Sequence, residues 1–211
     1  MPYHVAQHET SISSDEDNDS VISTSSETIT TYFRAYKEVC EFGLSLIKKS
    51  KIGGKGLTVE IDESKFGKRK YNRGRKVKGQ WVIGGICNET NDVFLVSVDK
   101  RDRETLIPII VANVEQGSII STDCWGAYND LSQYGYIHET VNHSKYFVDP
   151  STGTNTQKIE NLWRCVKRTL PDTHKVKESF DLELAEYLWR RFHIHNQNDL
   201  FQTFLKDASL M

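Results

Sequence analysis

The chain has 211 residues, of which 37% are hydrophobic and 27% charged, an ordinary composition for a globular protein with one core. No stretch approaches the roughly 18 apolar residues that span a bilayer, and the N-terminus lacks the layout of a signal peptide, so no membrane partner is expected. The four cysteines are widely spaced without a CxxC pair, which argues against a zinc ribbon or a disulfide framework.

The first 31 residues differ in composition from the rest of the chain. They are rich in Ser and Thr and contain six acids but no Lys or Arg, so 23 of the 29 acids lie in residues 32–211 beside all 27 bases. Such a segment buries too little apolar surface to offset the entropy of ordering. Residues 1–31 are therefore predicted to be a disordered acidic tail, and the basic remainder is compatible with a polyanionic partner.

Helical periodicity begins directly after this tail. The run YFRAYKEVCEFGLSLIKK (32–49) places apolar residues along one stripe, and a cluster of glycines from Gly53 to Gly56 ends the pattern. Residues 32–56 are predicted to be an N-terminal helix with a linker, followed by the main domain over residues 57–205.

Strand patterns dominate the start of the main domain. Residues 57–62 (LTVEID) alternate between apolar and polar, and the β-rich runs 80–89 and 93–98 flank a turn signal, which predicts a hairpin. Residues 104–114 have the spacing of a helix that tolerates Pro108 near its first turn. Residues 118–123 (SIISTD) predict a short buried strand that ends on an acid.

The second half of the main domain adds helices to the sheet. The patterns predict a helix over 124–134, a fifth strand over 136–142 and an amphipathic helix over 156–170 that Pro171 stops. One or two helices follow in 182–205. Three strands in a meander, then helix, strand, helix, strand and helices, is the element order of the ribonuclease-H-like fold, an α/β mixed five-stranded sheet flanked by helices.

Three acids occupy positions where such a fold brings carboxylates together. Asp62 is predicted to close the first strand and Asp123 the fourth, and these strands are neighbours in the predicted sheet. Glu160 lies one turn into a helix, at the edge of its apolar stripe. Phosphodiester cleavage needs two divalent ions, and hard cations such as Mg²⁺ prefer carboxylate oxygens. Each acid alone could be a solvated surface group, but an acid at the end of an apolar strand needs a partner.

Other acids are weaker candidates. Glu63 follows Asp62 directly, and strand alternation places it on the opposite face, so we predict that it lies outside the site. Asp149 and Asp172 lie in predicted loops and are less suited to be the third ligand.

A basic segment follows the first strand. Residues 65–79 contain eight Lys or Arg and no acid, and phosphates would supply the missing counter-charge; the alternatives are a solvated arm or a nuclear-import signal. Tyr71 could stack on a base or sugar. On the helix that carries Glu160, basic residues follow one and two turns later, where they could contact substrate phosphates. The alternative is that these cations only interact favourably with the dipole at the helix C-terminus. The predicted DNA-binding residues are Lys68, Arg69, Lys70, Arg73, Arg75, Lys76, Arg164 and Lys167.

Two tryptophans and one histidine near these motifs are expected to have mainly structural roles. Trp125 and Trp163 are expected to pack in the core or to wall the site. His143 could contact substrate or support the metal cluster, and a structural role is the simpler expectation.

Three segments together resemble one family. The runs VEIDESKFGKRKYNRGR (59–75), STDCWGAYNDLSQYGYIHETVNHSKYFVDP (121–150) and NTQKIENLWRCVKRTLP (155–171) look like the DDE domain of Merlin-type transposases, which are related to bacterial insertion sequences. The resemblance covers roughly residues 32–205. It implies a ribonuclease-H-like catalytic domain over residues 57–205, with Asp62, Asp123 and Glu160 as catalytic acids and metal ligands.

The resemblance also implies an activity. It is metal-dependent DNA cleavage and strand transfer in cut-and-paste transposition, with two Mg²⁺ or Mn²⁺ ions as cofactors and transposon ends and target DNA as partners. Paired DNA ends suggest a homodimer. A nuclear location is expected in a eukaryotic host and a cytoplasmic one otherwise. Such transposases have an N-terminal DNA-binding region where this chain has the acidic tail, so the alternatives are a truncated copy and a degenerate or domesticated DNA-binding protein without catalysis.

Overall fold

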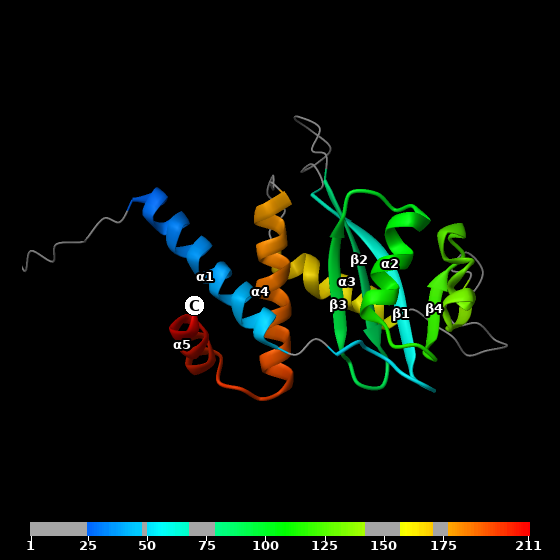
Figure 1. The fold of residues 1–211 in the computed structure, drawn as a ribbon. Helices are drawn as coiled ribbons and strands as arrows, with labels where there is room; N and C mark the ends of the chain where they lie inside the picture. The colour runs from blue at the N-terminus through cyan, green and yellow to red at the C-terminus, as the bar shows by residue number, and fades with distance from the viewer. Residues whose placement is uncertain (1–24, 48–49, 68–78, 142–156, 171–176) are drawn as a thin grey trace, which may run out of the picture.

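A mixed sheet of five strands forms the centre of the computed structural model (Figure 1), which describes residues 25–47, 50–67, 79–141, 157–170 and 177–211. The strand order is β3-β2-β1-β4-β5. Strands β1, β2 and β3 form an antiparallel meander, and β4 and β5 lie parallel to β1. This topology is the predicted ribonuclease-H-like fold. The strands are β1 (Thr58–Phe66), β2 (Gln80–Cys87), β3 (Val93–Val98), β4 (Ile119–Asp123) and β5 (Ile137–Val141).

Helices cover both faces of the sheet. Helix α2 (Arg103–Asn113) lies on one face and α3 (Gln157–Thr169) on the other, where α4 (Lys177–His195) also contacts β3. Alternate side chains of β1 serve the two faces: Val59 and Ile61 pack with α2, whereas Phe66 packs with α3 and α4. A sheet buried on both faces needs strands that are nearly continuous in apolar residues, and β2 (QWVIGGIC) has this character.

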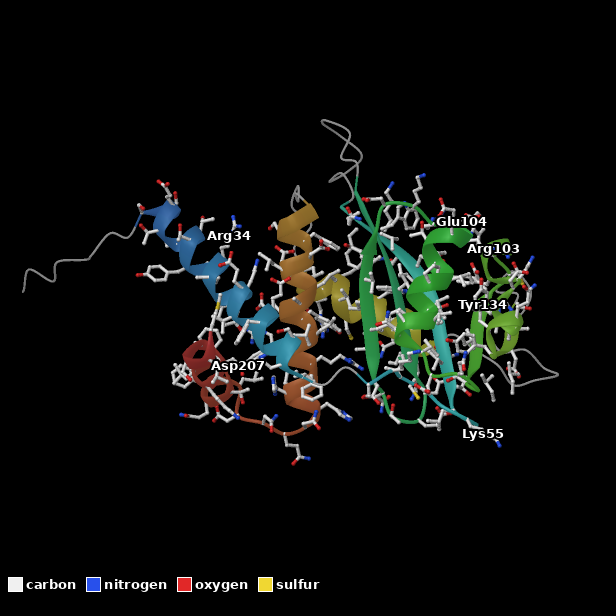
Figure 2. All side chains as sticks on the ribbon, in the orientation of Figure 1. Arg34, Lys55, Arg103, Glu104, Tyr134 and Asp207 are labelled. Atoms are coloured by element: carbon white, nitrogen blue, oxygen red, sulfur yellow. The ribbon has the colours of Figure 1, made fainter. Side chains whose placement is uncertain are left out.

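Three helices, α4 and two others, pack against one another. Helix α1 (Ser26–Leu46) lies against α4 and against α5 (Leu200–Leu210). Figure 2 shows Asp207 on α5, whose Oδ2 accepts a 2.8 Å hydrogen bond from the indole Nε1 of the buried Trp189. A Cβ at Gly43 of α1 would lie 2.7 Å from this indole nitrogen, so only glycine permits the close approach. None of the described helices is long and apolar enough to cross a membrane.

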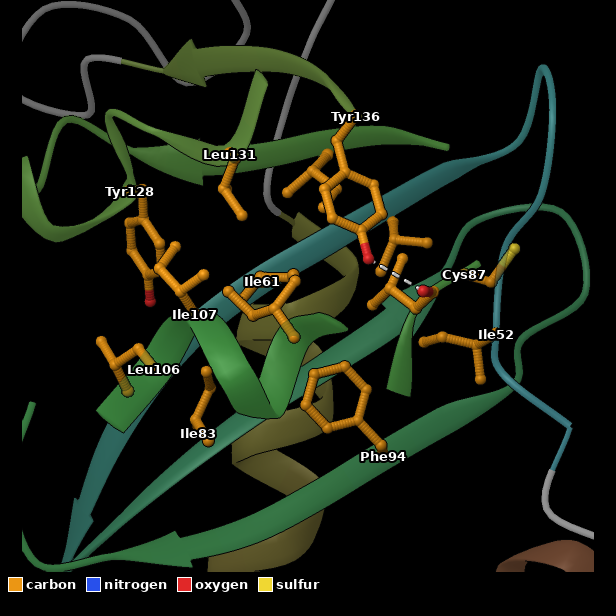
Figure 3. Packing of buried hydrophobic residues seen from close by; sticks show 14 of the residues in the cluster. Ile52, Ile61, Ile83, Cys87, Phe94, Leu106, Ile107, Tyr128, Leu131 and Tyr136 are labelled. Atoms are coloured by element: carbon orange, nitrogen blue, oxygen red, sulfur yellow. Dashed lines mark hydrogen bonds between the residues drawn. The ribbon is translucent and has the colours of Figure 1, made fainter. Parts of the chain in front are cut away.

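The larger core cluster lies between α2 and the sheet. Figure 3 shows Leu106 and Ile107 of α2 against Ile61, Ile83 and Phe94 of the three antiparallel strands. Two short 3-10 helices, η2 (Gly126–Tyr128) and η3 (Leu131–Tyr134), contribute a buried side chain each. Side chains of both β1 and β4 belong to this core, and these two strands carry Asp62 and Asp123.

Several element boundaries differ from those expected from the sequence. Strand β1 runs on to Phe66, because residues 63–66 pair with residues 80–83 of β2, so Asp62 lies within the strand and does not close it. The single helix expected over 124–134 is wrong, since that segment forms η2 and η3 through i+3 bonds such as Tyr128 N–H to the Trp125 carbonyl. Pro108 lies in the middle of α2.

The ends of the chain also differ from expectation. Helix α1 begins six residues before the predicted start, with Ser25 as N-cap accepting from the Thr28 N–H. Residues 26–31 therefore belong to this helix, although they were expected to be part of the disordered tail. Residues 1–24 lie outside the described residues. The sequence predicts one or two helices over 182–205 and the structure has two: α4 ends at His195, and α5 starts at Leu200 with Asp199 as its N-cap.

Candidate active site on strands β1 and β4

Asp62 is held by an indole from the helix on the same face of the sheet. Its Oδ2 accepts a 2.9 Å hydrogen bond from Nε1 of Trp163 on α3, and Trp163 is only 5% exposed. The indole can lie there because residue 84, opposite Asp62 in β2, is glycine. A Cβ at Gly84 would lie 2.7 Å from Cη2 of Trp163. Asp62 therefore has a fixed acceptor position, on the face predicted from the alternation in β1.

Asp123 ends β4 beside Asp62's strand. Strands β1 and β4 are parallel, with Glu60 of β1 in register with Ser121 of β4, so both aspartates lie two residues further on in neighbouring strands. The Oδ1 atom of Asp123 accepts a 3.0 Å hydrogen bond from the Trp125 N–H, which fixes the carboxylate by its own loop. The structure thus brings together the two aspartates that the sequence singled out.

Glu63 lies on the opposite face of β1 from Asp62, as predicted, but it is close to both aspartates. Its side chain is 4% exposed, accepts from the Tyr128 hydroxyl and has Arg101 Nη1 3.7 Å from its Oε2. Burial raises the pKa of Glu63; the Tyr128 hydrogen bond and Arg101 oppose this effect, whereas the negative charges of Asp62 and Asp123 add to it. Glu63 is therefore part of the same electrostatic cluster.

Sequence analysis missed Tyr128 and Arg101 as members of this cluster. A signal was present, since Glu63 shares the buried face with Val59 and Ile61, and a carboxylate there needs a donor and a cation. The sequence does not indicate which residues these partners are, because Tyr128 and Arg101 are both distant from Glu63 in the chain.

Glu160 lies in the first turn of α3, at an exposed position beside the buried Ile159. The fully buried Glu60 of β1 accepts a 2.9 Å hydrogen bond from the Ile159 N–H through Oε2. Burial raises the pKa of Glu60, and this backbone bond and the nearby Asn88 side chain oppose the effect. Within the part of the chain that the structure describes, Oε1 has no partner at hydrogen-bonding geometry. Two carboxylates of β1, on Glu60 and Asp62, thus hold the first turns of the helix that carries Glu160.

The structure does not place Glu160 with Asp62 and Asp123 as a complete set of metal ligands. Among the described residues, no group of three His, Cys, Asp or Glu side chains is placed to hold a metal ion. Asp62 and Asp123 form a pair of hard oxygen donors at adjacent strands, which suits Mg²⁺ or Mn²⁺. The assignment of Glu160 as the third ligand remains a prediction.

The basic residues divide between described and undescribed parts of the chain. Arg164 and Lys167 are exposed on α3, and Lys167 Nζ lies 5.6 Å from the centroid of the Phe66 ring. Arg164 is one turn from Glu160, so cations and the predicted third acid share one helix surface. The predicted DNA-binding residues Lys68, Arg69, Lys70, Arg73, Arg75 and Lys76 lie outside the described residues, as do Tyr71, His143, Asp149 and Asp172.

The Trp163 hydrogen bond has a measurable consequence. Trp163→Phe keeps a ring over Gly84 but removes the donor to Asp62, and loss of a group that orients a metal ligand costs about 10–100-fold in activity. If Asp62 acts as the metal ligand that the sequence predicts, the predicted metal-dependent DNA cleavage should fall by this factor. Trp189→Phe is the matched control, because it removes an equivalent indole–carboxylate bond in the α1–α4–α5 helices. Equal cleavage rates for the two variants would contradict the positioning role.

Comparison with known proteins gives one family assignment. Residues 52–191 match the model of a family described as the ISXO2-like transposase domain. The matched range contains β1 to β5, Asp62, Asp123 and Glu160. A search of curated proteins found no significant match.

Solved structures show distant likenesses. A chain of the simian T-cell lymphotropic virus intasome with PP2A regulatory subunit B56 gamma has 13% identity and a TM-score of 0.44, covering 72% of this chain and 58% of that chain. The HTLV-2 integrase catalytic core with magnesium, in its dimeric form, has 16% identity and a TM-score of 0.36, covering 69% and 98% respectively. The Mos1 strand transfer complex has 11% identity and a TM-score of 0.29, covering 82% and 61%.

Proposed function

Since this chain belongs to the ISXO2-like transposase domain family, a family of DDE transposases, we propose that Asp62, Asp123 and Glu160 hold two divalent metal ions for DNA cleavage and strand transfer. The single observation that carries the proposal is the position of Asp62 and Asp123 on parallel neighbouring strands inside the matched domain, each two residues beyond the paired Glu60 and Ser121. We assign the catalytic domain to residues 57–205.

The proposed chemistry divides between ions and protein. When bound, Mg²⁺ or Mn²⁺ ions activate the attacking oxygen of water or of a 3′-hydroxyl and stabilise the leaving oxygen. Asp62 and Asp123 supply ligands whose orientations are set by the Trp163 indole and by the Trp125 N–H. Glu160 supplies a ligand from α3. Arg164 and Lys167 contact substrate phosphates and position the scissile strand.

The finer assignments follow from the sequence motifs. The three quoted segments support a Merlin-type member of the family, with transposon ends and target DNA as substrates. Joining two ends in one reaction favours a homodimer, and a DNA substrate implies a nuclear location in a eukaryotic host. This chain spans 58% of the simian viral chain and 61% of the Mos1 chain. The activity of a complete transposase is therefore part of the proposal.

A nicking assay tests the proposal. Supercoiled plasmid and short duplex DNA are incubated with the full chain in Mg²⁺, in Mn²⁺ and in excess EDTA, beside Asp123→Asn. Nicked product is expected with either ion and is lost in EDTA. Asp123→Asn should lose at least about a hundredfold in rate while retaining DNA binding in a gel-shift assay, because a ligand contributes more than the groups that orient it. Metal-independent nicking, or an unchanged rate in the variant, would refute the proposed site.

A further inference from the structure

An exposed tryptophan lies directly beside the proposed site. The chain has four tryptophans. Trp163 and Trp189 are 5% and 1% exposed and Trp81 is half-buried, whereas Trp125 is 46% exposed. An indole left in solvent forgoes the stabilisation that burial gives. Of these four tryptophans Trp125 is the most open to solvent, and since single exposed aromatic side chains are common, its exposure indicates a ligand only together with the groups that lie beside it.

Trp125 is fixed relative to Asp123. Its N–H donates to Asp123 Oδ1 at 3.0 Å, and the 3-10 helix η2 starts at the next residue. The Tyr128 N–H donates back to the Trp125 carbonyl at 3.2 Å. Both backbone polar groups of Trp125 are thus engaged, and the indole lies within two residues of a proposed metal ligand.

A cation lies next to this indole. The Arg101 guanidinium carbon is 3.8 Å from the centroid of the Trp81 ring and 5.3 Å from that of Trp125, and Nη1 is 3.7 Å from Glu63 Oε2. A guanidinium stacked on an aromatic ring and paired with a buried carboxylate loses little further entropy when it binds a ligand. The Arg101 side chain is still 34% exposed, so it can contact an incoming anion.

An aromatic face beside a fixed cation suits one chemical class. The ring stacks on a base and the guanidinium contacts a phosphate, as in sites for single-stranded nucleic acid. A base inside a duplex already stacks on neighbours on both sides, so an unpaired base gains more from the indole. An apolar protein partner would have no use for a cation held 5.3 Å from the ring centroid.

We propose that Trp125 and Arg101 bind an unpaired nucleotide of the DNA substrate next to the position where Asp123 acts. The indole stacks on the base and Arg101 contacts its phosphate. The identification of the nucleotide as a neighbour of the cleaved phosphodiester rests on the proposed function; the binding site itself does not.

Binding of labelled DNA by the full chain tests the proposal. Two probes are compared by fluorescence anisotropy in Ca²⁺ buffer, with intact DNA verified on gels: a blunt duplex and the same duplex with an unpaired 3′ adenosine. Wild-type protein is expected to prefer the overhang. Trp125→Leu should weaken overhang binding by about 5- to 150-fold, the usual value of one stacked base, and Trp125→Phe by less. Wild type, Trp125→Leu and Trp125→Phe should bind the blunt duplex with equal affinity.

Two further variants complete the test. Tyr134→Leu removes another exposed aromatic side chain, on η3 (Figure 2), and should leave overhang affinity unchanged. Arg101→Gln should reduce the salt dependence of overhang binding by about one phosphate contact, whereas Trp125→Leu should not.

The contrary outcomes are distinct from failure of the proposed function. No wild-type preference for the overhang, or equal overhang affinity in Trp125→Leu and wild type, would overturn the nucleotide site. An unchanged salt slope in Arg101→Gln would overturn the phosphate contact. These readouts need no cleavage, so an inactive protein that still prefers the overhang would refute the catalytic proposal alone.

Discussion

Asp62→Asn is expected to lower the rate of Mg²⁺-dependent DNA cleavage by at least about a hundredfold while leaving the fold intact. The amide oxygen can still accept the hydrogen bond that Trp163 Nε1 donates at 2.9 Å, so α3 stays in place. What is lost is the negative charge that a divalent ion requires. The measurement is the nicking rate of variant and parent at saturating DNA.

Metal binding offers a second readout for this variant. A ligand that binds only the folded protein raises its stability in proportion to the logarithm of ligand concentration. Mg²⁺ should therefore raise the melting temperature of the parent but not of Asp62→Asn. In EDTA the variant should be at least as stable as the parent, since Asp62 contributes to the raised pKa of the adjacent Glu63 and its removal relieves that repulsion.

A charge-matched control separates local from general effects. Glu115→Gln removes one negative charge at an exposed position outside the cluster and should leave both cleavage and Mg²⁺ stabilisation unchanged. Cleavage by Asp62→Asn at the rate of this control would rule out Asp62 as a metal ligand.

Gly84→Ala is expected to lower both stability and cleavage. The added Cβ would lie 2.7 Å from Trp163 Cη2 and 2.8 Å from Leu95 Cδ2, closer than carbon atoms approach in proteins. Relief requires α3 to move away from β2, and overpacking of this kind costs about 1–3 kcal/mol. Because the displaced ring carries the donor to Asp62, cleavage should fall by about 10–100-fold as well. Urea unfolding and the nicking rate measure the two effects.

The neighbouring glycine provides a matched control. A Cβ at Gly85 would lie 2.9 Å from Phe94 Cζ, on the α2 face of the same strand, so Gly85→Ala also overpacks the core but leaves Trp163 in place. Gly126→Ala meets nothing closer than 4.0 Å and should be neutral in stability. If Gly85→Ala loses as much activity per unit of lost stability as Gly84→Ala, the link through Trp163 is wrong.

The strands and their order along the chain were predictable from local patterns. Alternation in LTVEID, the turn between residues 88 and 92, and an apolar strand ending on Asp123 each depend on a few adjacent residues. The expectation that Asp62 and Asp123 lie on neighbouring strands came from the ribonuclease-H-like fold that this element order indicates, and the parallel pairing of β1 with β4 confirms it. The apolar stripe of residues 156–170 correctly predicted α3, since Ile159, Leu162, Trp163 and Val166 are its buried residues.

Local patterns failed where distant residues decide the conformation. Residues 63–66 read as the start of a basic loop, but pairing with β2 makes them strand. Residues 124–134 have the composition of a helix, yet burial of Tyr128 and Leu131 in the core and the bond from Trp125 to Asp123 favour two short 3-10 turns. Tertiary contacts outweigh the weak intrinsic preference of so short a segment.

By itself, then, the sequence determined which residues of a strand or helix face the core and which acids lie on the same elements. Both depend only on the period of the strand or helix. Only the tertiary structure decided which groups hold those acids. Trp163 is 101 residues from Asp62, Ile159 is 99 residues from Glu60, and Tyr128 is 65 residues from Glu63. No local pattern encodes such pairings, since they arise only when α3 and η2 pack against β1.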